Sequence, residues 1–200
     1  MKTLIVFDHP YGAQAYRNEP HNRSFSAALC HRIMETERER GADVDVIDLA
    51  ADGFDPVMSK ADLANWRRGV PMNTQVADYQ QRMLDADRIV FVFPIWWELM
   101  PARTKGFLDK VYAKNLLYTQ SKDGRSMMTC LKPHVEVFAV TTMGTPNILY
   151  RLVFGKPVVK ALGVGLCRKT GISKFQWRSF SSVDKMSLEE RQKLLEQFKL

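Results

Sequence analysis

The sequence predicts a doubly wound α/β fold, in which helices cover both faces of a parallel β-sheet. Three apolar runs of strand length, Thr3–Phe7, Ile89–Phe93 and Val135–Thr141, are typical of strands buried on both faces. Segments with helical patterns alternate with these strands along the chain, as parallel pairing requires. The 200 residues contain no repeat, low-complexity tract or linker, so we expect a single domain over residues 1–200.

A long polar loop and then a helix follow the first strand. Ser24 or Asn22 is placed to cap this helix, because each side chain can accept from free backbone N–H groups, and Gly41 is placed to end it. Valines then alternate with aspartates around Val44 and Val46, which predicts a strand with one exposed face at an edge of the sheet.

The run Ile89–Phe93 is the expected central strand. Pro94 ends it, because proline cannot donate to a sheet ladder, and Pro101 is placed to open a helix over Ala102–Tyr112. A capping box at residues 187–190 predicts the last helix, with an apolar stripe at Leu188, Leu194, Leu195 and Phe198. The other expected elements are helices at residues 60–68, 74–85 and 149–162, a loop at 115–132 and a last strand at 171–176.

Composition limits the class of protein. With 46 % hydrophobic and 26 % charged residues, the chain is of ordinary globular type, and its apolar runs are too short to span a bilayer. We see no signal peptide, and three widely spaced cysteines without metal-ligand spacing predict free thiols, a cytoplasmic location and no metal site. The net charge of +7 is dispersed, which favours attraction of phosphorylated small molecules over nucleic acid.

The carboxyl ends of the first, third and fourth expected strands lead into unusual loops. In doubly wound sheets, ligands bind at this edge. There is no GxGxxG motif after the first strand. Instead, His9 and the helix start Ser24-Phe25-Ser26 suit a phosphate, because free amides and the helix dipole favour an anion. Arg17, His21 or Arg23 could add charge-assisted hydrogen bonds. The alternative is that Ser24 only caps the helix and His9 is an ordinary loop residue.

The other two loops offer an aromatic pair and a polar edge. Trp96 and Trp97 either fill the core or wall a pocket for a flat ligand, and the segment from Thr141 to Gly144 supplies hydroxyls and backbone amides. We call the group His9 and Ser24–Ser26 the phosphate seat, because it is expected to bind a phosphate. This phosphate seat, an aromatic wall at Trp96 and Trp97, and an amide-rich edge at residues 141–144 together suit a flavin mononucleotide unit.

Several motifs resemble those of the flavodoxin-like NAD(P)H:quinone oxidoreductases over roughly residues 2–155. They are His9-Pro10, the segments at residues 24–29 and 93–97, Pro101-Ala102, residues 105–107 and Thr141-Thr142. The resemblance implies a flavodoxin-like five-stranded parallel sheet of order 2-1-3-4-5. It also implies a homodimeric, cytosolic flavoenzyme that passes hydride from NAD(P)H through flavin to a quinone by ping-pong transfer.

The resemblance also assigns roles to individual residues. The flavin phosphates would be held by His9, Ser24, Phe25 and Ser26. The ring would be lined by Pro94, Ile95, Trp96 and Trp97, and its polar edge by Thr141, Thr142, Met143 and Gly144. Tyr150 would be the catalytic tyrosine, and the substrate pocket would contain Trp97, Tyr150 and Tyr118, the last reaching across the dimer.

The chain also departs from the family pattern. Ser26 replaces the usual asparagine, Met143 replaces the first glycine of a TTGG turn and so predicts a crowded flavin edge, and Lys156 stands near the place of the histidine that follows the tyrosine. FMN or FAD, NADH or NADPH, and a quinone, nitro or azo acceptor all stay open. Rival functions are an electron carrier, which the positive charge disfavours, a flavin-binding regulatory subunit, and a nucleic-acid binder.

Overall fold

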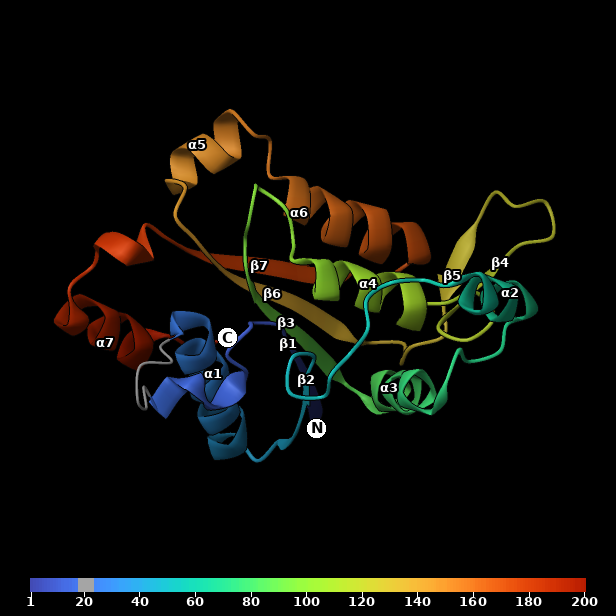
Figure 1. The fold of residues 1–200 in the computed structure, drawn as a ribbon, viewed down its shortest axis with the longest axis horizontal. Coiled ribbons are helices and arrows are strands. Elements are labelled where there is room, and N and C mark those ends of the chain that lie inside the picture. The colour runs from blue at the N-terminus through green and yellow to red at the C-terminus, as the bar shows by residue number, and fades with distance from the viewer. Residues whose placement is uncertain (18–23) are drawn as a thin grey trace.

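Five parallel strands form one sheet in the computed structural model, which describes residues 1–17 and 24–200. Their order is β2-β1-β3-β6-β7 (Figure 1). The strands are β1 (Lys2–Phe7), β2 (Asp43–Asp48), β3 (Arg88–Pro94), β6 (Glu136–Met143) and β7 (Lys174–Ser181). The expected doubly wound sheet is confirmed, and its order is the predicted 2-1-3-4-5 once two hairpin strands outside this sheet are left out of the numbering.

Helices cover both faces of the sheet. The helices are α1 (Phe25–Glu39), α2 (Lys60–Arg68), α3 (Thr74–Asp85), α4 (Ala102–Val111), α5 (Asn147–Leu152), α6 (Pro157–Val159) and α7 (Leu188–Gln197). After α6 the chain continues helically through a π-helical stretch, Lys160–Cys167, and a 3-10 turn, Arg168–Thr170; two further 3-10 turns are η1 (Ala13–Arg17) and η4 (Val183–Lys185). One core lies between the sheet and α3, α4 and α6, and a second lies between the sheet and α1 with α7.

Strand β3 is the centre of both cores. Ile89, Phe91 and Phe93 pack into the core beneath α3 and α4, whereas Val90 and Val92 pack into the core beneath α1. All five side chains are buried, because β3 has a paired strand on each side and a helix layer over each face. This environment explains the unbroken apolar run that the sequence shows here.

The expected helix boundaries are largely confirmed. Ser24 is the N-cap of α1, and its Oγ accepts from the Ala27 N–H at 3.1 Å; Asn22 lies outside the described residues. The capping box before α7 is present, with Ser187 and Glu190 bonded reciprocally. Gly41, at φ 77°, follows the end of α1.

Four expectations in the second half of the chain need correction. The expected loop at 115–132 contains a hairpin, β4 (Tyr118–Gln120) and β5 (Met127–Thr129). The expected helix at 149–162 is two helical segments. The first, α5, ends before Gly155 and Lys156, which have positive φ, and the second starts at Pro157 and continues to Thr170. Gly171, also at positive φ, ends that helix, so the last strand starts only at Lys174. Leu188 is largely exposed and does not join the apolar stripe of α7.

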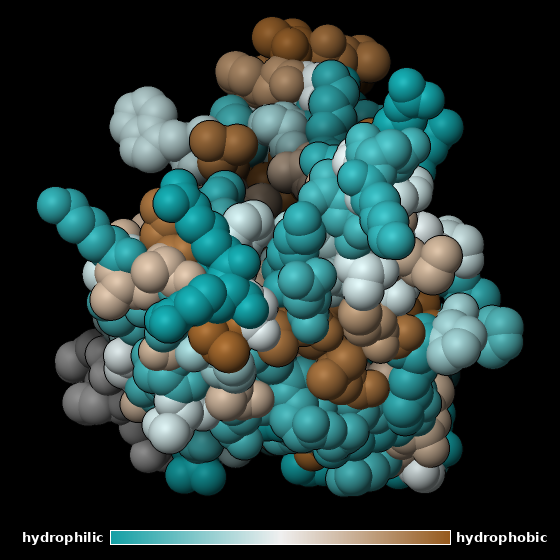
Figure 2. Space-filling view, turned by 90° about the vertical axis from the view of Figure 1, so that its right-hand side faces the viewer, coloured by the Kyte–Doolittle hydropathy of each residue, from teal (hydrophilic) through white to brown (hydrophobic). Residues whose placement is uncertain are grey.

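Helix α5 stands at one end of the molecule and exposes an apolar surface. Hydrophobic side chains gather there at the top of Figure 2. The exposed ones on α5 and just after it are Ile148, Leu149, Leu152, Val153 and Phe154. Among the described residues, we find no helix that is both long and apolar enough to cross a membrane.

Close packing of α4 against the chain before α2 requires a glycine. A Cβ added to Gly106 would overlap the backbone and side chain of Pro56, and the Lys110 ammonium donates to the carbonyls of Asp55 and Val57 at 3.1 and 3.0 Å. The α4 helix is therefore seated directly on this segment.

We predict that Gly106→Ala destabilises the fold. Overpacking costs about 1–3 kcal/mol, which exceeds the gain of about 1 kcal/mol in helix propensity, so the free energy of unfolding measured in urea falls. The control is Gly144→Ala, where a Cβ would meet no atom within 4 Å. Unchanged or raised stability of Gly106→Ala would contradict the contact with Pro56.

Candidate functional site

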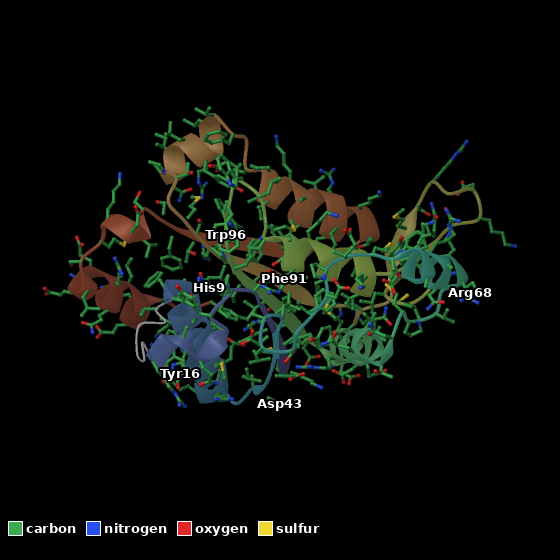
Figure 3. All side chains as sticks on the ribbon, in the orientation of Figure 1. His9, Tyr16, Asp43, Arg68, Phe91 and Trp96 are labelled. Carbon is green, nitrogen blue, oxygen red and sulfur yellow. The ribbon has the colours of Figure 1, made fainter. Side chains whose placement is uncertain are left out.

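Three loops at the carboxyl edge of the sheet surround a cavity of about 250 Å³. They follow β1, β3 and β6, which are adjacent in the sheet. Figure 3 shows His9 and Trp96, from the first two loops, at this same end of the sheet. All but Thr141 and Trp97 of the residues predicted to contact flavin line the cavity: His9, Ser24, Phe25, Ser26, Pro94, Ile95, Trp96, Thr142, Met143 and Gly144.

The first wall of the cavity is the N-terminus of α1. Ser24 has extended backbone geometry and caps the helix, which leaves the first N–H groups of the helix without intrahelical acceptors, as in any α-helix. The Ser26 hydroxyl lies 2.8 Å from the Thr142 hydroxyl, so a hydrogen bond joins this wall to the carboxyl end of β6. The site therefore presents hydroxyl and amide donors together, in the arrangement that binds phosphate.

His9 stands at the mouth of β1 as a neutral donor. Its Nδ1 accepts from the Tyr11 N–H at 3.2 Å, so the proton of the neutral ring belongs to Nε2. Burial lowers the pKa of His9, and this effect outweighs the opposing influence of Asp8 and Asp48. His9 thus offers an N–H to an anion in the cavity without a permanent charge.

The basic residues of the first loop are placed only in part. His21 and Arg23 lie outside the described residues. Arg17, at the end of η1, donates from Nε to the Tyr16 hydroxyl at 3.2 Å. It is not among the residues that line the cavity.

The two tryptophans sit in a tight turn rather than in the core. Trp96 and Leu99 exchange two backbone hydrogen bonds of 3.0 Å, and the two residues between them, Trp97 and Glu98, have φ of 49° and 63°. This is the geometry of a type I′ turn, which favours Asn-Gly. Trp96 is 47 % exposed at the cavity rim, and Trp97 is 97 % exposed and points away from the chain.

Tyr150 does not line the cavity. Its side chain is fully buried, its hydroxyl donates to the Glu98 carbonyl at 3.3 Å and it accepts from the Val158 N–H at 3.2 Å. Burial raises the pKa of Tyr150, and Glu98 adds to this rise. The Thr145 hydroxyl donates to Glu98 Oε1 at 2.7 Å, so Tyr150 and Thr145 together hold the strained turn in place.

The last residues of β6 divide their side chains between the two faces of the sheet. Thr141 is fully buried and its Oγ1 accepts from the Trp177 indole at 3.0 Å, so its hydroxyl is used away from the cavity. Thr142 points to the other face, toward Ser26. Met143 lines the cavity but also packs in the core with α4 and α6, and Gly144 has open space around it.

Tyr118 lies far from the cavity within this chain. It begins β4 and stacks on Tyr112 with ring centroids 5.7 Å apart. The hairpin projects at the end of the molecule opposite α1 and α7 (Figure 1). A contribution to the pocket requires a second copy of the chain.

The structure adds site residues that sequence patterns did not identify. Asp8 is buried, and its Oδ2 accepts from both the N–H and the hydroxyl of Thr104 at 2.8 Å. Val183 and Asp184, from η4, complete the cavity wall. Aspartate often caps the N-terminus of a helix, so the residue type of Asp8 is compatible with this role. Nothing in the sequence, however, indicates that its partner is Thr104, 96 positions away.

The described residues contain no cluster of histidine, cysteine and carboxylate side chains that could hold a metal ion. Cys30 and Cys167 are buried and Cys130 is exposed, all as free thiols. The site therefore offers neutral donors for an anion, a polar loop and an aromatic rim. Such a set of groups has the chemistry to bind and orient a planar phosphorylated ligand.

Comparison with known proteins places the chain in a family. An uncharacterized NAD(P)H oxidoreductase of Haemophilus influenzae is 28 % identical over 198 residues, which cover 98 % of this chain and 91 % of that protein. An NAD(P)H:quinone oxidoreductase from Methanothermobacter marburgensis matches with a TM-score of 0.78 at 21 % identity, covering 98 % and 94 % of the two chains. An FMN-dependent NADH-azoreductase from Bacillus anthracis, solved with FMN, has a TM-score of 0.72 at 18 % identity, covering 97 % and 93 %. The model of the flavodoxin-like fold family matches residues 1–199, and the chain belongs to this family.

Proposed function

We propose that the protein is a flavin-dependent NAD(P)H oxidoreductase that passes hydride from NAD(P)H to a quinone or related acceptor by ping-pong transfer. The observation that carries this proposal is the meeting of a phosphate seat, a polar loop and an aromatic rim in one cavity. The names of the relative and of the two structural neighbours support it, since they describe NAD(P)H oxidoreductases and one FMN-dependent enzyme.

The phosphate of the flavin would lie at the start of α1. The free N–H groups of Phe25 and Ser26, the hydroxyl of Ser26 and the Nε2–H of His9 would donate to its oxygens. These donors are neutral, so the helix dipole supplies most of the attraction for the anion. The dispersed charge of +7 would add a general attraction for phosphorylated ligands.

The ring would lie between Trp96 and the loop after β6. Thr142 and the backbone around Gly144 would face its polar edge, and the open space at Gly144 allows a close approach. When bound, the flavin supplies the group that accepts and returns hydride. The protein's own contribution is placement: it holds the ring, orients the nicotinamide or acceptor against it, and keeps the turn at Trp97 rigid.

A homodimer would complete the site. Trp97 and Leu99 are exposed on the turn. Helix α5, which follows Gly144 in the sequence, also exposes several apolar side chains (Figure 2). An apolar surface of this kind is typical of an interface. A second copy that covers it could bring its own Tyr118 to the cavity, because the hairpin projects from the molecule (Figure 1).

Flavin content and reduction by NAD(P)H test the proposal directly. We expect the purified protein to be yellow, or to bind added FMN or FAD at micromolar concentration, and the flavin absorbance to bleach anaerobically with NADH or NADPH. A quinone added afterwards should restore the colour. A colourless protein that binds neither flavin would contradict the proposal, and a flavin that NAD(P)H does not reduce would indicate a carrier.

We predict that Tyr150 and Trp97 have separable effects. Tyr150→Phe leaves the buried Val158 N–H without its acceptor, so the free energy of unfolding falls by about 1–3 kcal/mol. Turnover falls only a few-fold, well under the roughly hundredfold that a general acid or base contributes. Trp97 lies on the exposed turn that the proposed second copy would cover, so Trp97→Ala leaves the fold stable but weakens flavin retention or raises KM for the acceptor. Thermal melts, flavin content and steady-state kinetics measure these effects; loss of turnover in a stable Tyr150→Phe protein would restore the catalytic role.

We predict a pH dependence from His9 in the flavin-free protein. Burial lowers the pKa of His9 from its usual 6.5, so below pH 6.5 the unfolded chain binds more protons than the folded chain. The free energy of unfolding therefore falls as the pH is lowered through this window. His9→Asn should remove this part of the dependence in urea titrations, whereas the exposed His134→Asn control should keep it. Identical slopes in the two variants would contradict the neutral state of His9.

A further inference from the structure

The excess positive charge of the chain arises in one segment. Residues 137–183 contain seven lysines and arginines and no aspartate or glutamate, whereas the two kinds of charge are equal in number in the rest of the chain. Among the described residues, only Lys174 of these seven forms an ion pair, with Glu136 at 3.0 Å. The cations form no dense block, but the segment from α5 onward presents positive charge that no neighbouring carboxylate balances.

An apolar tip projects from this segment, between α5 and α6. Leu152, Val153 and Phe154 follow one another and are all exposed, and Figure 2 shows hydrophobic side chains projecting at the top of the molecule. We call these three residues the α5 tip. A contiguous group of exposed apolar side chains, rimmed by polar ones, is typical of a surface that contacts a partner or a membrane.

Three cations surround the α5 tip. Arg151 precedes it and Lys156 follows it in the sequence. The Lys160 ammonium lies over Gly155, 3.1 Å from the position that a Cβ there would take. We call Arg151, Lys156 and Lys160 the basic collar. An apolar group flanked by lysine and arginine suits the surface of an anionic bilayer, because the apolar side chains leave water while the charged ends stay among the lipid headgroups.

The backbone of the α5 tip is already hydrogen-bonded. The N–H groups of Val153 and Phe154 donate to the Leu149 carbonyl at 2.9 and 3.2 Å, and the Lys156 N–H donates to the Tyr150 carbonyl at 3.0 Å. Unpaired amides are costly in an apolar medium. The tip can therefore enter the edge of a bilayer without carrying these donors there unpaired.

We propose that the α5 tip and the basic collar dock the protein on the surface of an anionic phospholipid bilayer. The tip enters the boundary between headgroups and acyl chains, and the collar contacts lipid phosphates. The Tyr150 hydroxyl on α5 donates to the Glu98 carbonyl, in the turn that carries the cavity rim, so docking holds the cavity close to the lipid. The inference does not depend on the flavin site.

Two other occupants fit this surface less well. In a two-fold dimer centred on the tip, the same patch would meet itself, so the two collars would face each other and repel. The second copy proposed above would therefore contact the Trp97 turn and the start of α5 and leave the tip free. Duplex nucleic acid would satisfy the collar, but its phosphate backbone offers no apolar region for the tip.

Co-sedimentation of the purified protein with lipid vesicles tests the proposal. We expect binding to phosphatidylcholine vesicles that contain about 30 % phosphatidylserine, and an affinity for phosphatidylcholine alone that is at least about tenfold lower. Because the charged part of the contact is screened, binding should weaken as salt is raised.

Val153→Ser tests the tip, and Val57→Ser is its matched control. The two valines are 69 % and 68 % exposed, and Val57 lies outside the positive segment, before α2. Val153→Ser should lower the partition coefficient about tenfold, as the loss of a buried valine predicts, and Val57→Ser should leave it unchanged. Thermal melts of both variants should match the unaltered protein.

Lys160→Gln tests the collar. It should weaken binding to phosphatidylserine-containing vesicles about fivefold, the contribution of one cation near a charged surface. Its control is Lys193→Gln, since Lys193 is exposed on α7, outside the collar, and this variant should change nothing.

Several results would overturn the inference. They are absence of binding to anionic vesicles, equal losses in Val153→Ser and Val57→Ser, and equal losses in Lys160→Gln and Lys193→Gln. Conversion of a dimer to a monomer by Val153→Ser in sedimentation velocity would assign the tip to a contact between copies and overturn it. Binding to duplex DNA that depends on Lys160 but not on Val153 would do the same in favour of nucleic acid. Flavin content, measured on the same preparations, bears on the proposed function alone.

Discussion

The site depends on one buried carboxylate. Asp8, at the end of β1, accepts from the N–H and hydroxyl of Thr104 in the first turn of α4, where Pro101 provides no side-chain cap. The negative charge is favourable at this positive end of the helix. At the other end of the same loop, the Ile95 N–H donates to the Thr142 carbonyl at 2.7 Å. The segment between β3 and α4 is therefore held by residues at the ends of β1 and β6, the two strands that flank β3. These contacts fix Trp96 relative to the start of α1.

Within this clamped segment, the chain holds a strained turn. Two non-glycine residues, Trp97 and Glu98, adopt left-handed φ, which costs of order 1–2 kcal/mol per residue for an L-amino acid. Thr145, in the loop after β6, and Tyr150, on α5, offset this cost by donating hydrogen bonds to Glu98. The result is that a large aromatic ring is presented outward beside the cavity. Strain of this kind persists where surrounding contacts over-determine the backbone, and it concentrates at functional sites.

Sequence patterns predicted the frame of the site better than its details. The apolar run at Ile89–Phe93 and the cap at Ser24 identified the central strand and the start of α1, because burial on both faces and free helix amides leave clear local signatures. The same patterns could not show which side chains at the end of β6 face the cavity, because successive side chains of a strand point to opposite faces of the sheet. The sequence therefore predicts both Thr141 and Thr142 at the flavin edge, although the two side chains point to opposite faces. Asp8 with Thr104, and the meeting of α1 with α7, depend on contacts between distant residues that no local pattern records.

Two of the departures from the family pattern, Ser26 and Met143, are consistent with a site built mainly from backbone. A phosphate held by helix amides needs only the right helix start, and Ser26 there replaces an amide side chain with a hydroxyl that bonds Thr142. Met143 brings a large side chain into the turn, yet that side chain joins the core with α4 and α6, while the following Gly144 keeps the open space. If amides and peptide geometry do most of the binding in the proposed site, the identity of neighbouring side chains is free to change. The polar edge of the proposed flavin site thus stays open without the paired glycines of the family's TTGG turn.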